Sequence, residues 1–147
     1  MNNINIKLKK LVEDAVVPTY GTEFSAGADL YSVQEATIMP GETAFLGTGI
    51  ATAIPEGLVG LVYARSGMAC KRNLAPANKV GVIDSDYRGE IKVALHNHGN
   101  VPQTVAKGER IAQLVIAPYL RADYEVVNEL TETVRGAGGF GSTGTKK

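Results

Sequence analysis

Short runs of alternating apolar and polar residues recur along this 147-residue chain. Residues 4–8, 50–54 and 91–95 each repeat apolar or β-branched side chains at every second position, the period of a strand with one buried face. Residues 57–64 and 110–117 are nearly continuous apolar runs, which we interpret as fully buried strands. Turn signals containing Gly or Pro separate the runs. The pattern therefore predicts an all-β protein, a jelly-roll-like sandwich or barrel.

One short stretch and the last part of the chain depart from this pattern. Residues 66–72 predict the only helix, because Ser66 is a good N-cap residue. Lys71 and Arg72 suit a helix C-terminus, and Asn73 favours the left-handed backbone conformation that ends a helix. Residues 135–147 contain five Gly and one Phe and little that could build a core, which predicts a flexible glycine-rich C-terminal arm. We therefore predict one β domain over residues 1–134, followed by this arm.

Charge and cysteine content exclude several classes of protein. Lys and Arg together number 15 and Asp and Glu together also 15, which argues against a general nucleic-acid binder, since such proteins need a basic excess. No apolar run is long enough to predict a membrane span or a signal peptide. The single Cys70 excludes a disulfide framework, and we expect a half-buried small residue there in a cytoplasmic protein.

Three of the five Asp residues lie in segments marked by glycine: Asp29, Asp84 and Asp86. Asp84 directly follows the apolar pair Val82 and Ile83, at the end of a predicted strand. A carboxylate held rigidly there could orient and deprotonate a water molecule. The alternative is an Asp-Ser-Asp turn stabilised by its own backbone, and composition alone favours the turn.

Two further segments could bind phosphate. Arg65, Ser66 and Gly67 stand where the predicted helix begins, and free N–H groups with an Arg fork suit phosphate oxygens. An ordinary Ser N-cap beside a surface Arg is an equally good interpretation. Residues 135–144 combine Gly, Arg, Ser and Thr with Phe140, which could bind phosphate and stack on a base, or could be a flexible linker. His96 and His98 lack a third ligand, so a solvated strand end is the better interpretation.

Together these segments resemble the five ordered motifs of the homotrimeric dUTP pyrophosphatase (dUTPase) family. The resemblance spans residues 26–144, nearly the whole chain. Ala64 stands where the family usually has Pro, and Asn73 stands where Gly is common, but neither change removes a reactive group. The five segments are residues 26–31 (AGADLY), 64–69 (ARSGMA), 78–90 (NKVGVIDSDYRGE), 108–114 (GERIAQL) and 135–144 (RGAGGFGSTG).

The resemblance implies a jelly-roll subunit in a homotrimer with shared active sites. It implies hydrolysis of dUTP to dUMP and pyrophosphate by attack of water on the α-phosphorus, with Mg²⁺. Such an enzyme removes dUTP from the nucleotide pool and supplies dUMP for thymidylate synthesis. The expected ligand is dUTP, with no nucleic-acid or membrane partner.

The resemblance also assigns roles to residues. Asp84 would be the general base, and Asp29 would act through water on a Mg²⁺ ion held mainly by the triphosphate. Tyr87 would pack against the deoxyribose and exclude a 2′-hydroxyl. The other substrate-binding residues would hold the phosphate chain (Arg65, Ser66, Gly67, Gln113), form a uracil-reading hairpin (Asn78, Val82, Ile83, Lys92) or close as a lid (Arg135, Phe140, Gly141, Ser142, Thr143).

Two other functions deserve comparison with this one. A dCTP deaminase on a similar fold would need an additional carboxylate for proton transfer at the base, and Glu90 is the only spare one nearby. A non-catalytic nucleotide-binding or scaffold trimer would be signalled by loss of the general base or of the arm. Both are present in this sequence, which favours the hydrolase.

Overall fold

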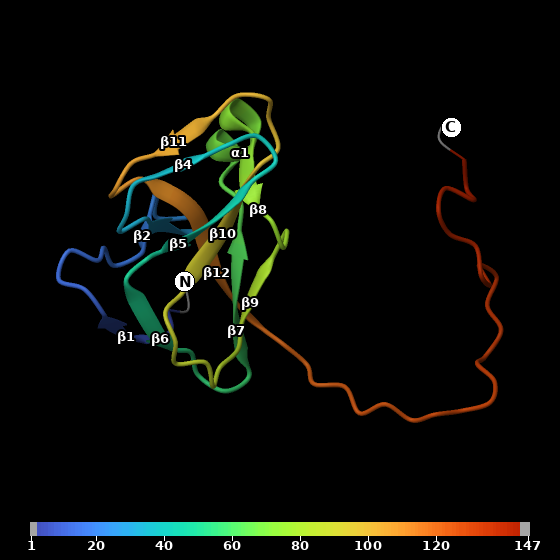
Figure 1. The fold of residues 1–147 in the computed structure, drawn as a ribbon. Helices are drawn as coiled ribbons and strands as arrows, with labels where there is room; N and C mark the ends of the chain where they lie inside the picture. The colour runs from blue at the N-terminus through green and yellow to red at the C-terminus, as the bar shows by residue number, and fades with distance from the viewer. Residues whose placement is uncertain (1–2, 145–147) are drawn as a thin grey trace.

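The computed structural model of the protein describes residues 3–144, and it consists mainly of antiparallel strands with one short helix (Figure 1). The predicted all-β, jelly-roll-like architecture is confirmed. The strands are β1 (Lys7–Lys10), β2 (Thr19–Tyr20), β3 (Ala28–Tyr31), β4 (Ala36–Ile38), β5 (Thr43–Gly47), β6 (Ile50–Ala53), β7 (Leu58–Tyr63), β8 (Leu74–Pro76), β9 (Gly81–Ile83), β10 (Lys92–Asn97), β11 (Gln103–Val105) and β12 (Arg110–Pro118), and the helix is α1 (Ser66–Arg72).

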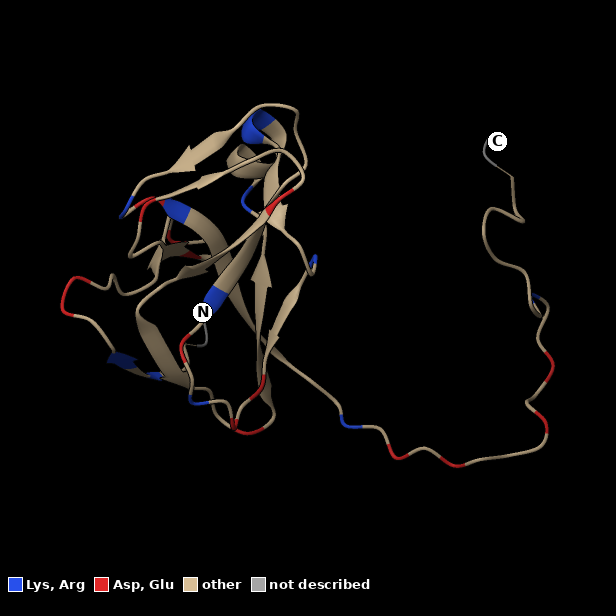
Figure 2. Cartoon of the chain, in the orientation of Figure 1, with Lys and Arg blue, Asp and Glu red and all other residues tan. Residues whose placement is uncertain are grey.

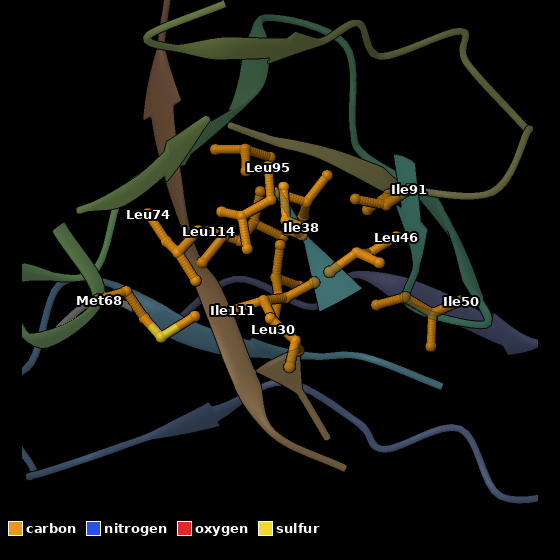
Figure 3. Close-up of a cluster of buried hydrophobic side chains, with 14 of the residues drawn as sticks. Leu30, Ile38, Leu46, Ile50, Met68, Leu74, Ile91, Leu95, Ile111 and Leu114 are labelled. Atoms are coloured by element: carbon orange, nitrogen blue, oxygen red, sulfur yellow. The ribbon is translucent and has the colours of Figure 1, made fainter. Parts of the chain in front are cut away.

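The strands form two main sheets around one core. The larger sheet has the order β2-β3-β12-β7-β9 and the smaller has the order β5-β10-β8, while β1 pairs with β6 and β4 with β11. Buried aliphatic side chains from both sheets meet between them (Figure 3). Strand β10 shows the predicted alternation, since Val93 and Leu95 are buried and Lys92 is exposed. This packing fixes the register of β10, because a slip by one residue would turn Lys92 inward.

Two strands expected to be fully buried are buried on one face only. In β7, Gly60 and Val62 face the core, whereas Val59 and Leu61 are half-buried and line a surface groove of about 1090 Å³. In β12, burial is confined to the first half of the strand, where a register shift near Arg110 places two consecutive residues against the core. The apolar second face of these strands is therefore accessible in the single chain, and pattern alone cannot separate such a face from a buried one.

Helix α1 has the predicted bounds, but its first turn is built differently from the expectation. The N-cap residue is Arg65, with extended backbone and no side-chain capping bond, so Ser66 is the first helical residue rather than the cap. Asn73 ends the helix with φ of 54°, the predicted left-handed stop. Cys70 on this helix is exposed, which contradicts the expected half-burial. Met68 is the one buried residue of this seven-residue helix, so Cys70 lies outside the core.

The chain leaves the folded body soon after β12 (Figure 1). Tyr119 still donates its N–H to the carbonyl of Gly57 at 3.1 Å, and residues 120–137 beyond it are all exposed. The extended segment thus begins well before residue 135, the predicted start of the arm, because residues 120–134 carry apolar side chains that find no core in this chain. Residues 145–147 of the predicted arm lie outside the described residues.

Apart from β1, in which three of the four residues are Lys, charged side chains do not gather on one element. In Figure 2, Lys and Arg are spread over separate strands, loops and α1, with Asp and Glu between them. Among the helices of residues 3–144, none has the length and apolar character needed to cross a bilayer.

Candidate active site

Six of the predicted substrate-binding residues surround one cavity of about 310 Å³ beside β9 and β10. A volume of this size suits a small organic ligand. Seven further residues complete its wall, among them Phe45 and Pro76, which carry no local signal, and Glu90, which the sequence suggests only as a spare carboxylate. The six predicted residues are Asn78, Val82, Ile83, Asp84, Tyr87 and Lys92.

Strand β9 holds Asp84 at the edge of this cavity. The strand pairs with β7 through Gly60–Ile83 and Val62–Gly81, and a Cβ on Gly81 would lie 3.1 Å from the Cβ of Val62. Asp84 follows immediately, with its side chain exposed and its carbonyl accepting the N–H of Tyr87 at 3.1 Å. The turn and the accessible carboxylate, weighed as alternatives from sequence, therefore coexist at this residue.

The ring of Tyr87 is fixed from two sides. Its hydroxyl donates to the carbonyl of Glu90 at 2.9 Å. A Cβ on Gly89 would lie only 2.4 Å from that hydroxyl oxygen and 2.6 Å from the ring carbon that bears it, so a larger residue at this position would displace the ring. Tyr87 therefore presents a firmly placed aromatic wall to the cavity, which suits contact with a sugar or base.

The carboxylate of Glu90 is already engaged. One oxygen accepts the N–H of Gly49 at 2.9 Å, and the other lies 3.7 Å from the Nζ of Lys92. A carboxylate that moves a proton at a bound base must be free to face it. These contacts argue against the deaminase alternative, for which Glu90 was the only candidate.

A second group of predicted residues meets where α1 begins. Arg65 donates from Nε to one oxygen of Asp29 at 2.7 Å, and Arg110 donates from Nη1 to the other oxygen at 3.2 Å. Asp29 is 8% exposed, so its charge is buried between two guanidinium groups. Charge-assisted bonds of this kind fix orientation as well as supplying energy. Arg110 had no assigned role, although its position inside the fourth motif was a signal that could have identified it.

Gln113 supports the same region from β12. Its Nε2 donates to the carbonyl of Ala64 at 2.8 Å, directly before Arg65 in the chain. A Cβ on Gly27 would lie 2.4 Å from the Oε1 of Gln113, which explains glycine at this position in the first motif. Gln113 therefore lies beside the predicted phosphate-binding residues, and in this chain it bonds to the backbone of the residue directly before them.

The two groups do not share a cavity in the single chain, and the arm joins neither. The residues lining the 310 Å³ cavity include none of Arg65, Asp29 or Gln113. In the arm, Arg135 bonds only locally, donating to the carbonyl of Gly138 at 2.9 Å, and the ring of Phe140 is fully exposed. The predicted lid residues, Arg135, Phe140, Gly141, Ser142 and Thr143, lie on the extended segment away from the body (Figure 1).

Metal-ligating side chains do not cluster in the described chain. His96 and His98 lie edge to face with ring centroids 4.4 Å apart, and His96 is bonded through Nδ1 to the hydroxyl of Thr43 at 2.8 Å. Desolvation, with the nearby charges of His96 and Lys79, lowers the pKa of His98. Within residues 3–144, no three His, Cys, Asp or Glu residues are grouped so as to hold a metal ion.

Comparison with known proteins gives relatives along nearly the entire chain. The family model for dUTPase matches residues 13–144. The deoxyuridine 5′-triphosphate nucleotidohydrolase of Nautilia profundicola is 50% identical over 141 residues, covering 96% of this chain and 99% of that protein. The protein of the same name from Clostridium acetobutylicum is 46% identical over 144 residues, covering 98% of this chain and 99% of that protein.

Solved structures give the same answer for the fold. The dUTPase of Staphylococcus bacteriophage 80alpha, solved with dUPNHPP, superposes with a TM-score of 0.91 at 30% identity, covering 97% of this chain and 100% of that one. A dUTPase variant from phage phi11 of S. aureus, described with a structural Mg(II) ion, superposes with a TM-score of 0.81 at 26% identity over 88% of this chain and all of that one. With the motifs, the cavity and these relatives in agreement, the chain belongs to the dUTPase family.

Proposed function

We propose that this protein is a dUTP diphosphatase that hydrolyses dUTP to dUMP and pyrophosphate. The observation that carries the proposal is the convergence of Asn78, Asp84 and Tyr87 on one cavity, with the accessible carboxylate of Asp84 at its edge. The family relationship supplies the substrate. The product dUMP serves thymidylate synthesis, and removal of dUTP protects the nucleotide pool. A cytoplasmic location suits this role and the exposed free thiol of Cys70.

In the proposed reaction, Asp84 accepts a proton from a water molecule whose oxygen attacks the α-phosphorus. A new bond forms between that oxygen and the α-phosphorus, while the bond to the oxygen bridging the α- and β-phosphorus breaks. The electron pair of that bond leaves with pyrophosphate. The reaction moves one proton and transfers the nucleotidyl group from pyrophosphate to water, so positioning and charge stabilisation are the main tasks of the protein.

The remaining predicted residues hold the substrate. Backbone groups at Val82 and Ile83, with Asn78 and the start of β10 at Lys92, read uracil, and a tight backbone pocket rejects the extra methyl group of thymine. Arg65, Ser66 and Gly67 bind the phosphate chain, with Gln113 supporting the backbone beside them. The arm closes over phosphate and base through Arg135, Phe140, Gly141, Ser142 and Thr143, in which glycine and hydroxyl groups suit phosphate contacts.

The residues present fit a magnesium ion that arrives with the nucleotide. Both oxygens of Asp29 accept bonds from guanidinium groups, which argues against direct ligation of the ion and leaves only their remaining lone pairs for a bridging water. Mg²⁺ retains several waters and commonly binds through substrate phosphates. Bound in this way, it would neutralise charge on the triphosphate, and Asp29 would hold it through water.

A panel of four nucleotides tests the proposed function. The purified protein is incubated with Mg²⁺ and dUTP, dTTP, dCTP or UTP, and pyrophosphate and ammonia are both measured. We expect rapid pyrophosphate release from dUTP alone. Ammonia release from dCTP would instead support the deaminase, and nucleotide binding without either product would support a non-catalytic protein.

We further propose that the active enzyme is a homotrimer. Val59, Leu61 and the exposed Val82 present apolar surface along the groove of β7 and β9. Leu120 and Tyr124 on the extended segment are 99% and 93% exposed. Apolar surface of this kind marks an interaction site. Since the cavity and the phosphate-binding residues lie apart in one chain, a neighbouring copy would bring them together.

Light scattering or analytical ultracentrifugation should therefore give a mass near three times the 15.5 kDa of one chain. The exposed apolar segment gives the physical reason, because its burial on a neighbour removes it from water. A monomer that keeps full activity would contradict shared active sites.

Replacing Tyr87 by Ala should raise activity on UTP relative to dUTP. The fixed ring leaves no room for a 2′-hydroxyl, and its removal opens that space. The ratio of kcat/KM values for the two nucleotides should shift toward UTP by about tenfold, the scale of one steric contact in a pocket. An unchanged ratio would show that another group excludes ribose.

A further inference from the structure

Helix α1 is too short to hold its own position. It has seven residues, fewer than an isolated helix needs for stability in water, and the side chain of its N-cap residue Arg65 makes no capping bond to the helix. The direction of its first N–H groups is therefore set by contacts with the rest of the fold. Those N–H groups belong to the segment proposed to bind the phosphate chain.

Neighbouring residues near the start of β12 hold the two ends of this helix. At the N-terminal end, Arg110 and Arg65 share the carboxylate of Asp29. At the C-terminal end, Arg72 forms an ion pair with Glu109, the residue directly before Arg110. One short stretch of chain therefore ties both ends of α1 to the sheet.

The contacts of Arg72 use all three nitrogens of its guanidinium group. Nε donates to the side chain of Gln103 at 3.1 Å, and Nη2 donates to the carbonyl of Thr104 at 2.6 Å. Nη1 donates to one oxygen of Glu109, whose other oxygen accepts the N–H of Ala106 at 2.9 Å. The planar fork of Arg fits three such acceptors in fixed directions, whereas the single ammonium of Lys does not.

Partial burial distinguishes this pair from an ordinary surface ion pair. The side chains of Arg72 and Glu109 are 27% and 30% exposed, and Nη1 of Arg72 also lies 3.6 Å from the sulfur of the buried Met68. For comparison, Lys107, two residues before Glu109, forms an ion pair with Asp14 in which both side chains are exposed. Exposed pairs add little to stability or order, whereas bonded and partly buried ones hold a defined geometry.

We propose that Arg72 is a positioning residue for phosphate binding. By tying the C-terminal end of α1 to Gln103, Thr104 and Glu109, it fixes the rotation and tilt of the helix, and so the placement of Ser66 and Gly67 at the other end. Displacing these groups by about 1 Å is enough to cost a large part of catalytic efficiency. The inference rests on the proposed function, since it takes the triphosphate as the ligand of this helix end.

The test compares a ligand that has phosphates with one that has none. Arg72→Met keeps the unbranched apolar stem of the side chain but removes the guanidinium fork. Equilibrium titrations use deoxyuridine, which reaches only the base and sugar pocket, and a non-hydrolysable α,β-imido analogue of dUTP with Mg²⁺. We expect binding of the analogue to weaken about tenfold, binding of deoxyuridine to stay within twofold, and the KM for dUTP to rise more than kcat falls.

Three further variants complete the test. Lys107→Met is the matched control, because it removes the exposed ion pair with Asp14, and this variant should bind both ligands as the unaltered protein does. Arg72→Lys should recover little of the lost binding, because it restores charge without the fork. Glu109→Gln should also weaken binding of the analogue but not of deoxyuridine. The double variant Arg72→Met with Glu109→Gln should bind the analogue at most about twofold more weakly than either single variant, since both changes remove the same contact.

Two outcomes would overturn the inference. One is unchanged binding of the analogue by Arg72→Met and Glu109→Gln. The other is an equal loss of both ligands with a lowered melting temperature, which would indicate a general role in stability. Turnover of dUTP by the unaltered protein tests the proposed function separately, so its failure is distinguishable from failure of this inference.

Discussion

Replacing Asp84 by Asn is expected to lower kcat for dUTP by about 10²–10⁴-fold, the scale for loss of a positioned general base. The amide keeps the shape and hydrogen-bonding capacity of the side chain, but it cannot accept the proton of the attacking water. The backbone turn should survive, because the carbonyl of Asp84, rather than its side chain, accepts the N–H of Tyr87. Steady-state release of pyrophosphate measures the loss, and titration with a non-hydrolysable analogue should show nucleotide binding retained.

Asp86 supplies a matched control for this experiment. It lies two residues further along the same segment, is also exposed, and lines the large groove rather than the 310 Å³ cavity. Asp86→Asn therefore makes the same chemical change at the same net charge outside the 310 Å³ cavity, and it should leave kcat within about threefold. Near-full activity of Asp84→Asn, or equal losses in the two variants, would remove Asp84 from the role of base.

Deleting residues 135–147 should leave the folded body intact but reduce turnover of dUTP by about 10²-fold. The described part of this segment makes only local contacts, such as the bond from Arg135 to Gly138, so the core loses nothing when it is removed. Turnover should fall because closure over the nucleotide excludes water and positions the phosphates. Melting temperature and solution mass should stay nearly constant, and pyrophosphate release reports the loss.

Truncation after Gly144 is the control for the deletion, because it keeps residues 135–144, which carry the proposed contacts. That shorter protein should retain most of its activity. Native turnover without residues 135–147 would contradict the lid, and a large fall in melting temperature would show instead that the segment stabilises the fold.

Closure of the arm can also be observed directly, since the chain contains no Trp. Phe140→Trp places the sole indole at the proposed stacking position, on a side chain that is fully exposed without ligand. The α,β-imido analogue with Mg²⁺ should change its emission clearly, and dUMP should change it much less, because ordering the arm needs the phosphate chain to offset lost entropy. Equal responses to both ligands would show that the arm does not sense the triphosphate.

Local pattern was enough to predict five strand regions, which correspond to β1, β6, β7, β10 and β12, and the bounds of helix α1. The alternation over residues 91–95 predicted the buried face of β10, and Asn73 predicted the left-handed end of α1. The third motif predicted residues that line one cavity, because a hairpin keeps residues close in sequence close in space. Each of these features depends on period, turn chemistry or short separation along the chain.

The differences between sequence and structure share a cause, because each concerns burial, which depends on contacts with residues far away in the chain. Burial of Cys70 could not be judged from a short helix whose only buried residue is Met68. The predicted β domain includes the apolar residues 120–134, which are exposed beyond β12 in the single chain, because an apolar sequence does not show which surface covers it. The same ambiguity made β7 look buried on both faces.

The sequence by itself determined an all-β fold, one short helix, a glycine-rich end and the residue types needed for hydrolysis of a nucleoside triphosphate. Only the tertiary structure decided that Arg110 and Arg65 share Asp29, and that Arg72 reaches Glu109. These partners lie 81, 36 and 37 residues apart, so no local period or propensity relates them. They meet because pairing of β3 with β12 and packing of α1 fix distances that the linear order of residues leaves open.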